Sequence, residues 1–250
     1  MKKLFQTSLP LLAISLTLYS PIASVQAQSY PTKNPWQISQ TFKPPIGRND
    51  PNPVTTGGAT RGSSCLKENT KIIPLVPVNK LGLSVNSHPT FHVYLPSSSV
   101  KTAEFVIRND ADPEIFYQTT VTLPNQAGIV SLSLPTDLPP LKLDTTYHWF
   151  FTVVCDSQDS SKNPFIEGWV QRIKPDSSLS ATIAKADLRK QTTIYAEAGI
   201  WYDALTNLVQ LRRTEPNNLK LKMNWQQLLD SVGLNDIVSE PLIDLQLVNN

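Results

Sequence analysis

Short runs that alternate apolar and polar residues fill the middle of the sequence and limit what the chain can fold into. Between Lys71 and Lys174 these runs are rich in β-branched and aromatic residues, and clusters of turn residues separate them. Because no helical periodicity lies between the runs, antiparallel pairing without crossover helices is favoured. The spacing predicts seven strands, at 72–77, 90–96, 103–109, 114–124, 128–135, 145–155 and 165–173.

The stretch LKLDTTY, just before the most hydrophobic of these strands, refines the fold prediction. Leu141, Leu143, Thr145 and Tyr147 occupy its alternate positions. This pattern resembles the Leu-x-Pro-x-Thr-x-Tyr run of fibronectin type III domains, in which the tyrosine hydroxyl bonds back to the preceding backbone. Leu143 stands where proline is usual, so the match is partial. We therefore predict a mainly β fold, an antiparallel immunoglobulin/fibronectin III-like β-sandwich, over residues 63–175.

Helical periodicity begins after Pro175. Asp176 to Ser178 are available as N-caps of a first helix, and a run over 195–213 repeats its apolar residues at helical spacing. A third run, 221–234, ends near a glycine, which is typical of helix C-caps. The sequence therefore predicts a small α-helical C-terminal region over 176–250, which makes the chain α+β overall.

The first residues of the chain have the pattern of an export signal. Two lysines precede a mostly apolar run, and Val25-Gln26-Ala27 offers small residues at the spacing that a signal peptidase reads. Polar residues and prolines interrupt the run, which favours a cleaved signal over a transmembrane helix. We predict a cleaved signal peptide over 1–27 and a disordered Pro/Gly/Ser/Asn-rich segment over 28–62. The protein is expected in the periplasm, cell envelope or extracellular space, with no transmembrane segment after signal cleavage.

The charge balance argues against a nucleic-acid partner. Removal of residues 1–27 takes away two of the 22 basic residues and none of the 20 acidic ones. The remaining chain is formally neutral, and it lacks the basic excess that binding to phosphate backbones requires.

Cys65 and Cys155 are the two cysteines of the chain. In an exported protein, a pair of cysteines is most often a disulfide, and here it would tie the stretch GGATRGSSC to the strand at 145–155. A cysteine nucleophile would instead need a lowered thiol pKa and a base within hydrogen-bond reach. We favour the disulfide, and the reactive thiol is the alternative.

Other chemistry-bearing residues favour structural interpretations. His88 and His92 would lie about 13 Å apart on an extended strand, too far apart to share an ion, and with His148 they are interpreted as surface histidines. The carboxylates near Asp110 and Asp156 lack calcium-loop spacing and are interpreted as solvated turn residues. We therefore expect no catalytic residue, metal site or cofactor.

Aromatic residues predicted to lie outside the core form a candidate interaction surface. Tyr94, His148 and Phe150 alternate with core residues, and Trp201 and Tyr202 flank the apolar stripe of the run at 195–213. The other interpretation, which we favour, is that these side chains form the docking surface between the sandwich and the helices.

Several blocks of the sequence, in order, resemble a known family. They include GGATRGSSC, LVPVNKLGLSVNSHPTFHVYLP, TTYHWFFTVVCDSQDSSKNPFIEGWVQRI, GIWYDAL and WQQLLDSVGL, and the resemblance spans about residues 57 to 240. The family is the cyanobacterial family of exported proteins catalogued as domain of unknown function 928. The resemblance implies export, and it implies no activity, cofactor or catalytic residue.

Together these observations favour an exported, non-enzymatic envelope or extracellular protein that acts as an interaction module for an unknown envelope protein or glycan. An exported hydrolase or thiol-dependent enzyme that uses Cys65 or the loop carboxylates is the main alternative. A structural cell-wall component is the second alternative.

Overall fold

The computed structural model describes residues 41–44, 65–67, 70–79, 81–112 and 114–247. All of them belong to one compact unit, Ile38–Asn250. The predicted signal peptide and most of the 28–62 segment lie outside the described residues. Within the described ranges, no helix is long and apolar enough to cross a membrane.

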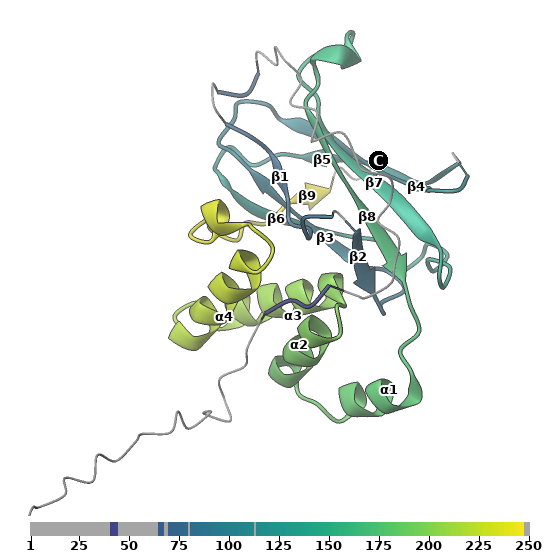
Figure 1. Ribbon diagram of the computed structural model, residues 1–250. Coiled ribbons are helices and arrows are strands. Elements are labelled where there is room, and N and C mark those ends of the chain that lie inside the picture. Colours follow the sequence, from purple (N-terminus) through teal and green to yellow (C-terminus); the bar gives the residue numbers. More distant parts are fainter. Residues whose placement is uncertain (1–40, 45–64, 68–69, 80, 113, 248–250) are drawn as a thin grey trace, which may run out of the picture. The chain divides into compact units, whose positions relative to one another are not determined.

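Two β-sheets and four α-helices make up the described part of the chain, so the fold is α+β (Figure 1). The first sheet has the order β1-β3-β6 and is antiparallel, with strands Ile73–Pro74, Thr90–Leu95 and Gly128–Ser133. The second has the order β2-β8-β7-β4-β5-β9, with strands Leu81–Ser84, Phe165–Arg172, Thr146–Val153, Thr102–Asn109, Ile115–Thr122 and Gln246–Leu247.

All seven predicted strands are present, and two further strands are not among the predictions. β2 has only four residues, LGLS, and its pairing with β8 is parallel. β9 has two residues and pairs with the end of β5. Such short segments carry too little alternation to be recognised without their partners.

Large aromatic side chains fill the core between the two sheets. Phe91 from the first sheet lies 5.1 Å from Phe105 and 5.6 Å from Trp149 of the second, measured between ring centroids. Gly168 makes room for Trp149, because a Cβ at this position would lie 2.6 Å from the indole Cζ2. The packing of the core therefore requires glycine at position 168 of β8, next to the large Trp149 side chain on β7.

The predicted tyrosine bond is present before β7. Tyr147 is 2% exposed, and its hydroxyl accepts a hydrogen bond from the backbone N–H of Lys142 at 3.1 Å. Asp144, in the turn between them, has a φ of 56°. The bond fixes the path by which the chain enters the central strand of the second sheet.

The helices follow β8 in chain order. They are α1 (Ser177–Ala184), α2 (Leu188–Glu197), α3 (Trp201–Thr214) and α4 (Leu219–Asp230). Asp176, Asp187 and Asn218 cap three of them, since each side chain accepts a hydrogen bond from an N–H of the first turn. The single run predicted over 195–213 is wrong at Gly199, whose φ of 72° separates α2 from α3.

Helix α3 docks against the sheets through its first turn, next to β2 and β3 (Figure 1). Tyr202 accepts a hydrogen bond from Trp149 Nε1 at 2.8 Å and donates one to the carbonyl oxygen of Trp169 at 3.0 Å. Burial raises the pKa of Tyr202, so the hydroxyl keeps the proton that it donates. A Cβ at Gly82 would lie 2.5 Å from the Tyr202 ring. The helix therefore enters the same core as the sheets.

Trp201 and Tyr202 are 0% and 1% exposed, so their assignment to an interaction surface was wrong. Trp201 donates its indole N–H to the carbonyl oxygen of Leu75 at 2.9 Å. Both residues form the contact between sheets and helices, as the favoured interpretation expects.

Residues 41–44 pack on the helices, although they belong to the segment predicted to be disordered. Phe42 is 4% exposed, and its ring meets that of Trp201 edge-on at 5.0 Å. The N–H of Phe42 donates to Ser231 Oγ, and that of Lys43 donates to the carbonyl oxygen of Ala196. The prediction of disorder is therefore wrong for residues 41–44, because the Phe42 side chain is buried against the helices.

We expect Tyr202→Phe to lower the free energy of unfolding by about 1–3 kcal/mol, because it leaves the buried Trp149 N–H without an acceptor. Urea denaturation followed by circular dichroism measures the change. Tyr94→Phe is the matched control, since Tyr94 is only half-buried, and it should cost less. Equal losses in the two variants would contradict the role given to Tyr202.

Candidate functional site

The outer face of the second sheet, on the side away from the core, carries a cluster of aromatic and charged side chains. Trp149 and Phe151 of β7 point into the core, so His148 and Phe150 point outward. The strand register places His148 between Arg108 of β4 and Trp169 of β8. It places Phe150 between Val106 and Glu167 on the same two strands. We call Arg108, His148, Phe150, Phe165, Glu167 and Trp169 the outer-face cluster.

The rings of the outer-face cluster stack on one another. His148 lies parallel to Trp169 with centroids 3.9 Å apart, and 4.0 Å from the ring of Phe150. The guanidinium of Arg108 lies over Phe150 at 4.8 Å from the ring centre, which is a cation–π contact. The faces of these rings are therefore largely occupied by neighbours within the cluster.

Exposure differs across the outer-face cluster. His148 and Trp169 are buried, with 8% and 5% of their surfaces exposed. Phe150, Phe165 and Arg108 are half-exposed. A partner could therefore reach the Phe150–Phe165–Arg108 side of the cluster, while the His148–Trp169 stack supports it from below.

Polar partners fix the buried side of the outer-face cluster. His148 Nε2 lies 3.1 Å from Glu167 Oε2, and the indole N–H of Trp169 donates to Asp110 Oδ1 at 3.1 Å. Burial lowers the pKa of His148, although the neighbouring Glu167 carboxylate opposes this shift. These contacts hold both rings in one orientation.

The structure brings together only two of the five residues predicted as an interaction surface. His148 and Phe150 are neighbours, whereas Trp201 and Tyr202 lie in the core and Tyr94 lies on β3 of the other sheet. Burial, together with the negative charge of the nearby Glu240, raises the pKa of the Tyr94 hydroxyl. The sequence analysis did not identify Arg108 and Trp169. The alternation of their strands predicts that both side chains point outward, but only the pairing of the strands shows that they lie beside His148.

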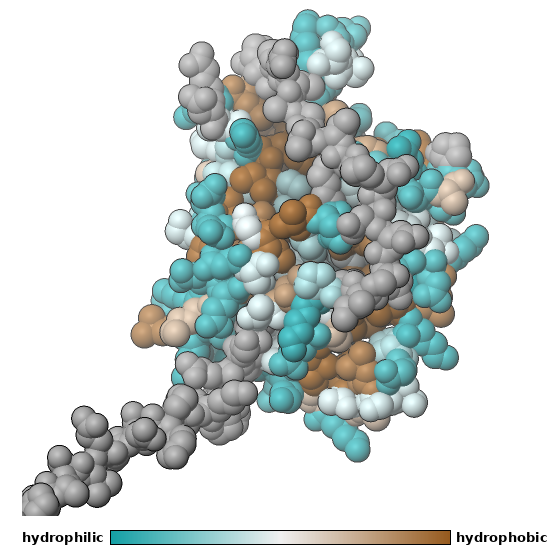
Figure 2. All heavy atoms as spheres, in the orientation of Figure 1, coloured by the Kyte–Doolittle hydropathy of each residue, from teal (hydrophilic) through white to brown (hydrophobic). Residues whose placement is uncertain are grey.

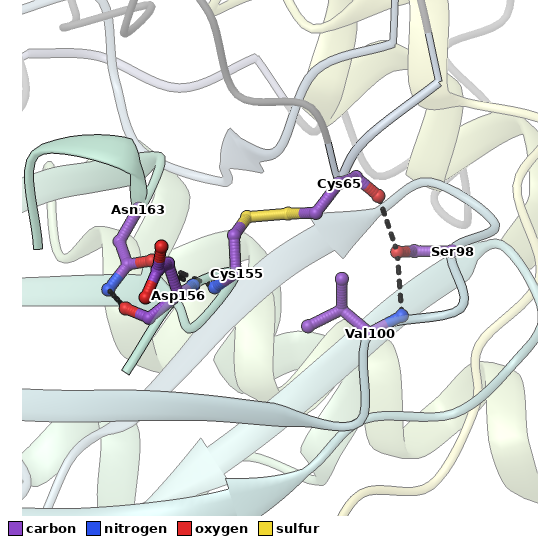
Figure 3. Close-up of a disulfide and its surroundings, with 6 residues drawn as sticks. All are labelled: Cys65, Ser98, Val100, Cys155, Asp156 and Asn163. Atoms are coloured by element: carbon purple, nitrogen blue, oxygen red, sulfur yellow. Dashed lines mark hydrogen bonds between the residues drawn. A yellow bond between two sulfur atoms is a disulfide. The ribbon is translucent and has the colours of Figure 1, made fainter. Parts of the chain in front are cut away.

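The predicted disulfide between Cys65 and Cys155 is present, with Cα atoms 5.5 Å apart (Figure 3). Cys155 follows the end of β7, and its N–H donates to Asn163 Oδ1 at 2.8 Å. The hydroxyl of Ser98 donates to the carbonyl oxygen of Cys65 at 3.4 Å. Figure 3 shows Asn163 on one side of the bridge and Ser98 on the other. Both cysteines are bonded, so neither offers a free thiol.

Carboxylates after Cys155 are used within their own loop. Lys162 Nζ lies 2.9 Å from Asp156 Oδ2 and 3.4 Å from Asp159 Oδ2. Hydrogen bonds from Lys162 and from the Gln158 N–H lower the pKa of Asp156. Among the described residues, no group of three or more His, Cys, Asp or Glu side chains is placed to hold a metal ion.

The assignment of His148 as a surface histidine was wrong, since only 8% of its surface is exposed. His92 is buried as well, so its assignment as a surface histidine was also wrong. It is 2% exposed, and its ring nitrogens lie 3.0 Å from Ser131 Oγ and 3.1 Å from Thr206 Oγ1 of α3. Burial, assisted by the positive charge of Arg213, lowers its pKa to about 3. This histidine is a neutral link between the first sheet and α3.

The buried His92 predicts a loss of stability in acid. Its folded-state pKa lies below the usual 6.5, so the unfolded chain binds a proton that the folded chain does not. The contribution is complete above pH 6.5 and is lost as the pH falls toward 3. In His92→Gln, the free energy of unfolding should therefore decline less steeply over this range in urea titrations at several pH values. An unchanged slope would contradict the assignment.

The disulfide closes a loop with a sequence separation of 90, which corresponds to about 4.6 kcal/mol of stabilisation by chain entropy. We expect the double variant Cys65→Ser/Cys155→Ser to lose free energy of unfolding of this order in urea. Ser98→Ala removes the hydrogen bonds of the Ser98 hydroxyl to the Cys65 carbonyl and to the Val100 N–H but leaves the bridge intact. It is the control and should lose much less. A double variant as stable as the native protein would contradict a structural role for the bridge.

Comparison with protein families identifies one to which the chain is similar. The profile of a family described as Domain of Unknown Function (DUF928) matches residues 56–242. No curated protein matches the chain. The matched region includes both cysteines and the whole outer-face cluster.

Proposed function

The chain belongs to the DUF928 family, whose description assigns no activity, and we propose that the protein is an exported, non-enzymatic module that binds another protein. The contact surface in this proposal is the half-exposed side of the outer-face cluster. The observation that carries it is an arginine and two phenylalanines supported by a buried His–Trp stack.

The strand order supports an immunoglobulin/fibronectin III-like sandwich. The strands of that fold are lettered A to G, with strand B between A and E in one sheet and strand F between C and G in the other. Here β3 lies between β1 and β6, and β7 lies between β4 and β8, so β3 corresponds to strand B and β7 to strand F. The bond from Lys142 to Tyr147 is a second shared feature. Because such sandwiches have many roles, the proposed function depends on the surface and not on the fold.

The composition of the outer-face cluster favours a protein over a glycan. Aromatic residues and arginine are enriched where binding energy concentrates in protein interfaces. A sugar would need a free aromatic face, but Arg108 lies over Phe150 and His148 lies on Trp169. The accessible edge of Phe150 and the half-exposed Phe165 instead offer apolar contacts next to a charge.

Export is supported by the signal-like pattern at the N-terminus and by the disulfide, because such bonds persist in oxidising compartments. The thiol-dependent alternative loses its nucleophile, since Cys65 is bonded to Cys155. Buried titratable groups serve structural contacts: His92 links β3 to α3, and Asp203 accepts a hydrogen bond from the Val85 N–H.

Site-specific photo-crosslinking from position 165 in the exporting cell tests the proposal. We expect one defined protein adduct, whose yield falls about tenfold or more in Phe150→Ala and Arg108→Ala without loss of thermal stability. Val78→Ala, at an exposed position away from the sheet face, is the control and should leave the yield unchanged.

Two results would contradict the proposed surface. One is an adduct that forms equally well in Phe150→Ala. The other is the absence of any protein adduct, together with tight fractionation of the protein with wall material, which would favour a structural component of the cell wall.

A further inference from the structure

Helix α4 meets the rest of the protein with one side only. Its buried side chains are Leu221, Trp225, Leu228 and Leu229. At 100° per residue they fall within one arc of the helix, as expected for a helix that covers a core. The indole N–H of Trp225 donates to the carbonyl oxygen of Val238 at 3.0 Å, which fixes the rotation of the helix.

The opposite side of α4 carries apolar side chains where polar ones are usual. Leu219 is 73% exposed and Met223 is 54% exposed, and the spacing of four residues places one above the other. Lys220 and Lys222 are exposed and flank this pair, one on each side. We call these four residues the α4 patch.

Folding of α4 does not require the apolar pair of the α4 patch. The side chain of Asn218 accepts hydrogen bonds from the N–H groups of Lys220 and Leu221, so the helix start is capped without help from Leu219. The packed side already supplies four buried residues. The packing of α4 therefore leaves Leu219 and Met223 as a neighbouring pair of apolar side chains on its solvent side.

The charge around the α4 patch is positive. Neither Lys220 nor Lys222 forms an ion pair with any residue that the structure describes. The nearest acid along the chain, Glu215, is engaged by Arg189 and by Asn218. Asp230 lies at the other end of the helix, about 16 Å from Leu219 at helical rise. Nothing in the helix sequence between them is acidic.

We propose that the α4 patch binds the surface of an anionic lipid bilayer. Leucine and methionine at the centre would enter the boundary between headgroups and acyl chains, and the two lysines would contact anionic headgroups. A neutral protein interface would not select lysines on both flanks of the apolar pair. Two apolar side chains give weak and reversible binding, which suits peripheral attachment.

The position of the α4 patch suits this contact. Figure 2 shows hydrophobic spheres projecting at the left edge of the molecule, where Figure 1 places α4, among hydrophilic ones. The proposal does not depend on the outer-face cluster, which lies on β4, β7 and β8. A failure of one would therefore leave the other standing.

Vesicle co-sedimentation of the exported, disulfide-bonded protein tests the proposal. The probes are vesicles of phosphatidylglycerol and phosphatidylcholine in equal parts, and vesicles of phosphatidylcholine alone. We expect binding to the mixed vesicles that weakens as salt is raised, and several-fold less binding to phosphatidylcholine alone.

Variants separate the two contributions. Leu219→Ser/Met223→Ser should lower binding to the mixed vesicles about tenfold, and Lys220→Gln/Lys222→Gln should lower it and remove most of its salt dependence. Val78→Ser, at an 83% exposed position outside the α4 patch, is the control and should bind like the native protein. Thermal unfolding checks that all variants are folded.

Two outcomes would overturn the proposal. One is a native protein that stays in the supernatant with mixed vesicles at low salt. The other is a folded Leu219→Ser/Met223→Ser variant that binds as well as the native protein, which would assign the lipid contact to another part of the chain.

Discussion

The buried side chain of Tyr202 joins α3 to both sheets. Its ring meets that of Phe91 of the first sheet edge-on at 5.3 Å, and its hydroxyl bonds to two strands of the second sheet. The hydroxyl accepts from the indole N–H of Trp149 on β7 and donates to the backbone carbonyl of Trp169 on β8. Its ring fits only because Gly82 lacks a side chain. Since this tyrosine lies in the first turn of α3, the start of this helix belongs to the same buried core as the two sheets.

This arrangement determines which surfaces remain for function. Trp201 and Tyr202 at the start of α3 lie in the core and offer no surface, whereas the outer face of the second sheet and the outer side of α4 both carry accessible apolar groups. The disulfide holds the chain at the end of β7, on the same strand that contributes His148 and Phe150. The proposed contact surface is thus built on a strand that is fixed at both ends, by Tyr147 and by Cys155.

Alternation and turn residues were enough to predict the seven main strands, the tyrosine bond and the disulfide, because each leaves a local pattern or a unique pair. The contacts of Trp201 and Tyr202 were not predictable in the same way. A helical stripe tells which residues share a face, but it does not tell whether a second element covers the neighbouring positions. Likewise, Arg108, His148 and Trp169 lie in three separate strands, and only the register brings them together.

The central claim is that the sheets and helices share one core and unfold together. Urea unfolding followed both by tryptophan fluorescence and by the circular dichroism signal of the helices tests it most directly. The account predicts a single transition with the same midpoint for both probes. A helical signal lost at clearly lower urea than the tryptophan signal would show two independent parts and contradict it.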